Sequence, residues 1–204
     1  MNPLSTIAES RANYSFLDTP TIADWNTYIL NGGLVYLANY EFASASQLDI
    51  NFAFSYPATQ FRNYRIVISN LLATTAGPLA IKMMDGNSTW ASGSYLTAYS
   101  SAYRQTTSAN PTVVSTGTLT GGSAWLCVNI DTANPTNLIF DIVNPNFASR
   151  TTFHGRGGSL GNNLNTFAGQ LSVTDVFNGI SLSRVFGGNI SCNAEVYGYR
   201  TETA

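Results

Sequence analysis

Charge is scarce in this 204-residue sequence: Asp, Glu, Lys and Arg make up 10% of it, and Lys82 is the only lysine. An ordinary soluble domain has about 25% charged residues. There is no run of basic residues, and nucleic-acid binding needs clustered Arg and Lys to contact phosphates. We therefore expect no nucleic-acid partner. Neutral polar side chains must cover most of the surface, which is typical of proteins that function within an assembly.

Histidine and cysteine are also rare, which argues against several kinds of site. His154 is the only histidine, and no G-x-S-x-G motif accompanies it, so a histidine-based hydrolytic triad is not expected. One histidine and two distant cysteines do not predict a zinc site. None of the eleven carboxylates is spaced to indicate the acid pair of a glycosidase. We therefore expect a protein that is not an enzyme, with no catalytic residues, no metal and no cofactor.

Long apolar runs are absent as well. No stretch approaches the roughly 20 residues of a membrane-spanning helix, so we expect no membrane insertion. The first residues, MNPLSTIAESRANYS, lack the basic region and apolar run of a signal peptide. Without export, Cys127 and Cys192 are expected to be reduced and buried, with a disulfide between them as the alternative.

What the sequence does contain, from Glu41 onward, is a succession of short alternating segments. Leu48, Ile50 and Phe52 alternate with polar or small residues, and farther on Tyr64, Ile66 and Ile68 alternate with Arg65, Val67 and Ser69. A period of two is typical of half-buried strands, and no later segment has a helical period. About ten such strands over residues 41–204 predict an all-β fold, an antiparallel β-sandwich of jelly-roll type.

The stretch from Leu79 to Tyr103 is the clearest local pattern. Asp85-Gly86 suits a two-residue turn, so the sequence predicts a hairpin here and a second one at Gly187-Gly188-Asn189. Tyr95, Tyr99 and Tyr103 fall on one face of the second strand. Such rings combine an apolar body with a polar tip. Packing in the core or between subunits is the simpler interpretation, and an aromatic platform for sugar rings is the alternative.

Residues 1–40 differ from the rest and are expected to form a short, partly helical or extended segment. A helix beginning near Thr21 would place Trp25 and Tyr28 on one face and end at Gly32-Gly33. The segment either packs on the β-domain or attaches it to another protein, with Trp25 and Tyr28 as the anchoring residues.

Gly155 to Asn165, GRGGSLGNNLN, is rich in glycine and asparagine and predicts a long exposed loop. A sugar-binding site would combine aromatic stacking with polar loop side chains. The candidate ligand-binding residues are, first, His154, Arg156, Asn162 and Asn163 and, second, Tyr99 and Tyr103.

Several segments, taken in order, resemble structural proteins of tailed-phage particles. DGNSTW followed by ASGSY (85–95) is similar to a strand–turn–strand pattern of such proteins, and GISLSRVFGGNISCNAEVYGYR (179–200) is similar to their closing strands. FASASQLDINF and FRNYRIVISN also fit the beginning of such a domain. The resemblance extends over about residues 41–200 and points to a tail fibre, tailspike or head-fibre domain.

The resemblance implies a virion protein, assembled in the cytoplasm of the host bacterium, that binds other virion proteins and forms a homo-oligomer, with a trimer favoured. Proteins of this kind often bind glycans of the host surface. We therefore expect residues 1–40 to attach the chain to the particle and the β-domain to contact the host. The alternatives are an architectural head-decoration, collar or tail-tip protein without a host ligand and, third, a polysaccharide depolymerase.

Overall fold

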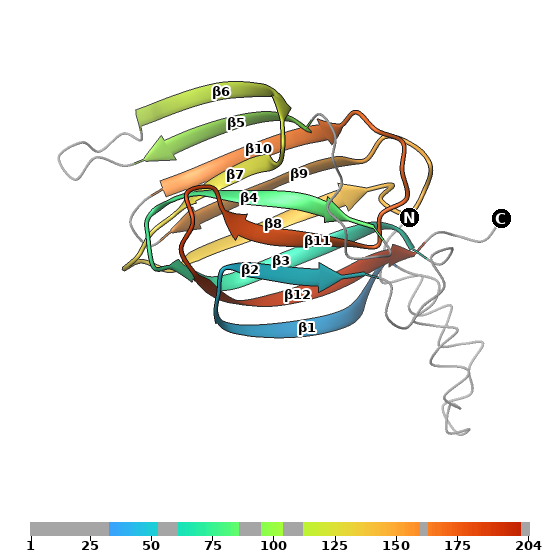
Figure 1. The fold of residues 1–204 in the computed structure, drawn as a ribbon, viewed down its shortest axis with the longest axis horizontal. Coiled ribbons are helices and arrows are strands. Elements are labelled where there is room, and N and C mark those ends of the chain that lie inside the picture. The colour runs from blue at the N-terminus through green and yellow to red at the C-terminus, as the bar shows by residue number, and fades with distance from the viewer. Residues whose placement is uncertain (1–32, 53–60, 86–94, 104–111, 160–162, 201–204) are drawn as a thin grey trace, which may run out of the picture. The chain divides into compact units, whose positions relative to one another are not determined.

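The computed structural model describes residues 33–52, 61–85, 95–103, 112–159 and 163–200 (Figure 1). Within these ranges the chain forms strands and no helix, so the all-β prediction is confirmed. Consequently, no described helix could cross a membrane. The strands are β1 (Leu34–Ala45), β2 (Gln47–Asn51), β3 (Phe61–Ala73), β4 (Gly77–Met84), β5 (Tyr95–Tyr103), β6 (Thr112–Gly122), β7 (Trp125–Ile130), β8 (Thr136–Val143), β9 (Thr152–Ser159), β10 (Asn163–Leu171), β11 (Gly179–Arg184) and β12 (Ile190–Arg200).

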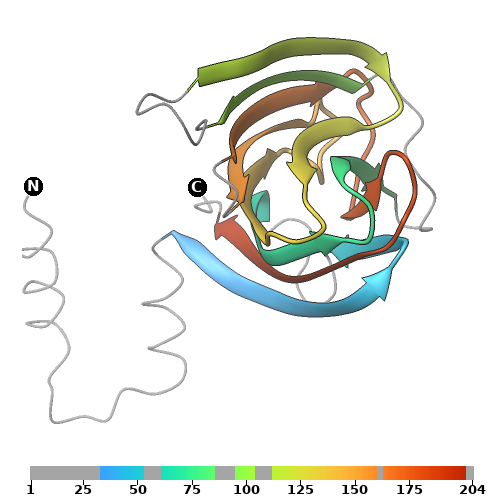
Figure 2. The ribbon, with the colours of Figure 1, turned by 90° about the vertical axis from the view of Figure 1, so that its left-hand side faces the viewer.

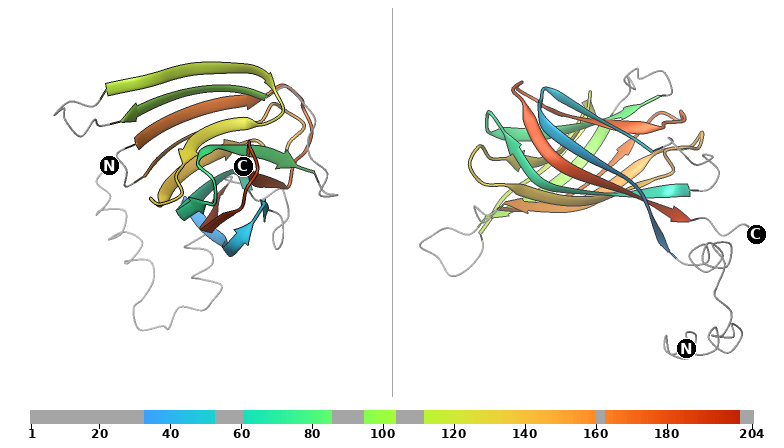
Figure 3. Two further views of the ribbon diagram at one scale, coloured as in Figure 1. Left: turned by 60° about the vertical axis from the view of Figure 1, so that its left-hand side comes forward. Right: turned by 90° about the horizontal axis from the view of Figure 1, so that it is seen from below.

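The strands form two antiparallel sheets. The large sheet has the order β1-β12-β3-β8-β9-β10-β5-β6, and the small sheet has the order β2-β11-β4-β7. The large sheet curves round the small one (Figures 2 and 3). The predicted antiparallel β-sandwich is therefore confirmed. One face of the large sheet packs on the small sheet, and the other, which we call the outer face, points away from it.

Two hairpins predicted from the sequence are wrong. β4 belongs to the small sheet and β5 to the large one, although Asp85-Gly86 between them suits a tight turn. β11 and β12 likewise lie in different sheets, and Gly187 and Gly188, with φ of 77° and 93°, carry the chain across. Alternation identifies a strand but not its partner, and a turn sequence fits a crossing between sheets as well as a hairpin.

The core lies between the two sheets and includes an aromatic cluster. Trp125 of β7 stacks on Phe153 of β9 at 4.2 Å between ring centroids and meets Tyr95 of β5 edge-on at 5.2 Å. The hydroxyl oxygen of Tyr95 accepts a hydrogen bond from the backbone N–H of Met83, 3.1 Å away. These contacts join β5 and β9 of the large sheet to β4 and β7 of the small one.

Both cysteines are free and buried, as the sequence predicted. Burial raises the pKa of Cys192 to about 12 and raises that of Cys127 well above its ordinary value. Because the thiolate is the reactive form, neither thiol is activated at neutral pH.

The β-domain begins earlier than the sequence indicated. β1 starts at Leu34, so residues 34–40 belong to the large sheet and not to the leading segment. The predicted helix with Trp25 and Tyr28 lies outside the described residues.

The predicted loop over Gly155 to Asn165 is also wrong, because most of it lies in β9 and β10, which pair with each other. Gly155 faces the core, and a Cβ atom there would lie 2.4 Å from Cβ of Phe140 and 2.5 Å from the carbonyl oxygen of Ile139. Gly157 is similarly close to Leu138, at 2.8 Å. These glycines therefore reflect close packing within the sheet, where a side chain has no room.

Candidate functional site

Five side chains form a row across the outer face of the large sheet. Tyr36 of β1 lies opposite Tyr197 of β12, which lies opposite Arg65 of β3, followed by Asp141 of β8 and His154 of β9. Directly opposed residues of antiparallel strands share one face. We call these five residues the polar row. It spans four strand spacings, or roughly 19 Å.

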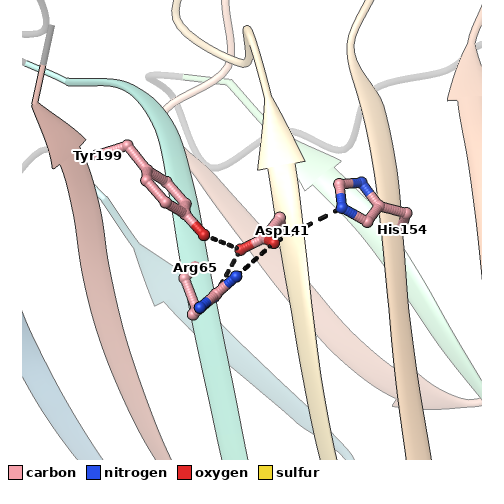
Figure 4. Close-up of polar contacts among 4 residues, drawn as sticks. All are labelled: Arg65, Asp141, His154 and Tyr199. Atoms are coloured by element: carbon pink, nitrogen blue, oxygen red, sulfur yellow. Dashed lines mark hydrogen bonds and ion pairs between the residues drawn. The ribbon is translucent and has the colours of Figure 1, made fainter. Parts of the chain in front are cut away.

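Asp141 is the centre of the polar row (Figure 4). Its Oδ1 and Oδ2 atoms accept hydrogen bonds from Nε and Nη2 of Arg65, both at 2.8 Å. The Tyr199 hydroxyl donates to Oδ1 at 2.9 Å, and Nε2 of His154 lies 3.6 Å from Oδ2. The Arg65 guanidinium also lies over the Tyr199 ring, 5.4 Å from its centroid. A two-point contact of this kind pairs the opposite charges of a guanidinium and a carboxylate and also fixes the orientation of the two side chains.

The contacts at Asp141 shift the pKa values of the groups involved. Burial alone would raise the pKa of Asp141, but hydrogen bonds from Arg65 and Tyr199, together with the charge of Arg65, outweigh burial and lower it. Burial and the hydrogen bond to Asp141 raise the pKa of Tyr199. The carboxylate is therefore ionised at neutral pH and holds Arg65 in place. The Arg65 side chain is 33% exposed, and its guanidinium has more N–H donors than the two that bond to Asp141.

The β1 end of the polar row is aromatic. Tyr36 is 54% exposed, and its ring meets that of Tyr197 edge-on, with 5.7 Å between centroids. The Tyr197 hydroxyl donates to Oε2 of Glu195 at 2.6 Å, and this hydrogen bond is the main reason that the pKa of Tyr197 is raised. Tyr36 thus presents an aromatic surface at one end of a row that also carries a guanidinium and a carboxylate. Such a combination suits a ligand that has both apolar faces and hydroxyl groups.

The structure brings together only some of the residues that the sequence suggested for ligand binding. His154 is in the polar row, with its side chain 63% exposed, and Arg156 follows two positions later on the same face of β9. Asn163 begins β10, and Asn162 lies outside the described residues. Tyr99 is partly buried and packs against the core, which fits the packing interpretation for that residue. Tyr103 ends β5, and its side chain is not part of the described structure.

Sequence reasoning missed most of the polar row. Arg65 and Asp141 are 76 positions apart, and each is flanked mainly by apolar residues in its strand. The only available signal was that a charged residue within a strand must point away from the core. Their pairing depends on the register between β3 and β8, which the sequence does not contain.

Comparisons of the chain with protein-family models, with curated proteins and with solved structures find no match. Within the described residues, no group of His, Cys, Asp and Glu side chains could hold a metal ion.

Replacing Asp141 with Asn is expected to destabilise the domain by about 2 kcal/mol at neutral pH, because a charged, two-point hydrogen-bonded contact is lost. The lowered pKa of Asp141 in the folded state means that its contribution is present above the unfolded value of about 3.9 and disappears as the pH falls through the folded value. The difference between the two proteins should therefore shrink below about pH 4.

Urea unfolding, followed by circular dichroism across this pH range, measures the effect of Asp141→Asn. The matched control is Asp49→Asn, since Asp49 is exposed and accepts a hydrogen bond only from the nearby Gln47 among the described contacts. A destabilisation by Asp141→Asn that stays constant down to about pH 2 would show that the carboxylate charge is not responsible.

Proposed function

We propose that this protein is a structural component of a bacteriophage particle, of the tail-fibre type, that contacts glycans of the host surface through the polar row. The observation that carries the proposal is the row itself: an exposed tyrosine ring, a fixed guanidinium, an ionised carboxylate and an imidazole on one sheet face. Sugar rings have apolar faces that stack on aromatic side chains and hydroxyls that hydrogen-bond to charged groups. The sequence resemblance to tailed-phage proteins and the low charge content support the particle context.

We also propose that the sandwich is a jelly roll with two inserted hairpins. The strand order supports this topology: without β5, β6, β9 and β10, the sheets have the orders β1-β12-β3-β8 and β2-β11-β4-β7. The chain then crosses between the sheets at β1–β2, β2–β3, β3–β4, β7–β8, β8–β11 and β11–β12, and only the connection from β4 to β7 stays within one sheet. The insertions β5–β6 and β9–β10 lie side by side and widen the large sheet. His154, on β9, belongs to this widened part.

An architectural role without a host ligand is the second candidate, and one feature favours it. Phe186, in the turn between β11 and β12, is 76% exposed, and Val185 beside it is also exposed. Neighbouring loops hold this turn through hydrogen bonds between Asn189 and Thr74, with the backbone N–H of Thr74 donating to the Asn189 carbonyl at 2.9 Å. A firmly held apolar tip suits docking on another protein of a particle.

Binding to an array of bacterial surface polysaccharides tests the proposed function. The full chain should bind at least one of them, and Tyr36→Ala and His154→Ala should each weaken that binding about tenfold, because each removes an exposed contact group of the polar row. The matched control is Leu164→Ala, since Leu164 is 56% exposed on β10 and also lies on the outer face, away from the row. Binding that all three variants retain would exclude the polar row as the contact surface. Absence of binding to any polysaccharide would favour the architectural role.

A further inference from the structure

β1 is an edge strand with an open side. Among the described strands it pairs only with β12, so a strand of twelve residues leaves one row of backbone N–H and C=O groups without a strand partner. Proteins usually protect such an edge with lysines, prolines or a short strand length. β1 has none of these, and Glu41 is its single charged residue. Irregularities in its pairing with β12, between Tyr36 and Ala38 and between Phe42 and Ala45, are the only protective feature present in β1.

The core-facing side chains of β1 are apolar and incompletely covered. Val35, Leu37 and Phe42 pack against the core but are only partly buried. On the outer face, the apolar Leu34 and Tyr36 are exposed at one end of the strand, and the polar Asn39 and Glu41 follow them. A partner strand along the open edge would complete the cover of the core-facing residues and pair the free backbone groups.

We propose that β1 pairs with β1 of a second copy of this chain, in an antiparallel arrangement round a two-fold axis, and so joins two large sheets into one. An antiparallel edge can pair with itself round a two-fold axis. If one residue of the first copy lies opposite a second residue of the other copy, the reverse pair forms on the other side of the axis. The near-neutral strand fits a second copy, since self-pairing of a charged edge would place like charges together.

One antiparallel register places core-facing residues of the two copies opposite each other and outer-face residues opposite each other. With residues 34–36 of one copy beside residues 41–43 of the other, Leu34 meets Ala43, Val35 meets Phe42, and Tyr36 meets Glu41. Val35 and Phe42 both point toward the core side, and Tyr36 and Glu41 both point to the outer face. The two-fold axis then passes near Asn39, and the irregularity between Tyr36 and Ala38 lies on either side of it, once in each copy. This register pairs the partly buried apolar residues with each other and keeps the two glutamates apart.

The dimer would also extend the polar row. Tyr36 stands at the β1 end of the row, so the partner's Glu41 would lie directly beside its ring, within reach of the tyrosine hydroxyl or of a bound ligand. The two polar rows would meet across the axis. This two-fold dimer differs from the trimer that the sequence resemblance implied. The molar mass in solution distinguishes the two oligomeric states.

Light scattering of the full chain measures that mass, and a charge exchange tests the register. The natural chain should have twice the monomer mass. Tyr36→Glu should weaken the dimer about tenfold or more, because it places two carboxylates opposite each other twice per dimer. The double variant Tyr36→Glu with Glu41→Lys should restore dimerisation, since each carboxylate then faces an ammonium group. Leu164→Glu, on the outer face but distant from β1, is the matched control and should leave the dimer intact.

Circular dichroism shows whether each variant is folded. A monomeric mass is taken as loss of dimerisation only for a variant that is folded. A natural chain that is monomeric at every attainable concentration, or trimeric, would overturn the proposal. Dimerisation that Tyr36→Glu leaves unchanged would also overturn it, since the two copies would then be joined by another surface. A folded double variant that stays monomeric would reject the register.

Discussion

Replacing Trp125 with Ala is expected to lower the free energy of unfolding by about 3–5 kcal/mol, the usual cost of truncating a fully buried tryptophan. Trp125 is completely buried and contacts Phe153 and Tyr95, two aromatic residues of the large sheet. Because Trp125 comes from β7 of the small sheet, the cavity would open where β5 and β9 of the large sheet pack on it. Urea unfolding followed by circular dichroism measures the change.

Trp125→Phe is the matched control for this prediction. A phenyl ring keeps most of the aromatic packing and removes the indole N–H, which has no hydrogen-bond partner among the described residues. We expect this variant to lose no more than about 2 kcal/mol, since the cavity is smaller and a buried unpaired donor disappears. If Ala and Phe cost the same, Trp125 does not hold the two sheets together in the way that its contacts indicate.

Gly155→Ala is expected to cost about 3 kcal/mol, a large effect for the addition of one methyl group. The added Cβ would lie 2.4 Å from Cβ of Phe140 and 2.5 Å from the carbonyl oxygen of Ile139, well inside van der Waals contact. Both atoms belong to β8, directly beside β9. Relief of the overlap therefore requires movement of a central strand of the large sheet. Thermal and urea unfolding report the loss.

Gly122→Ala provides a comparison at the end of β6. A Cβ atom there would lie 3.3 Å from its nearest neighbour, the carbonyl oxygen of Ala124. We expect a change below about 1 kcal/mol, because a shift of a few tenths of an ångström relieves this contact. Equal destabilisation at Gly155 and Gly122 would mean that general loss of glycine flexibility, and not the contact with Phe140, decides the effect.

The sequence was sufficient to predict the strands but not their neighbours. Leu48 and Ile50 are buried and alternate with polar residues, and Ile66 and Ile68 are buried and alternate with less buried ones. Alternation records which face of a strand is covered, and this depends only on the strand itself. Pairing depends on the rest of the chain: β1 lies beside β12, the last described strand. For this reason the turn at Asp85-Gly86 predicted a hairpin where the chain crosses between sheets.

The candidate site was predicted only in part for the same reason. His154 and Arg156 were selected because a lone histidine and an arginine stood in a glycine-rich segment, and both lie on the outer face of β9. The glycine-rich segment predicted a loop, because the sequence does not show that Phe140 leaves no room for a side chain at Gly155. Arg65 and Asp141 become neighbours only through the register of β3 with β8.

His154 offers the most direct test of the central claim that the polar row contacts host glycans. It is the only histidine of the chain, so its ring signals in a nuclear magnetic resonance spectrum need no assignment by mutation. Its exposed ring lies 3.6 Å from Asp141, within the row. We would titrate the full chain with a bacterial surface polysaccharide that it binds and follow these signals. The proposed function predicts that they shift in step with binding, and binding that leaves them unchanged would contradict it.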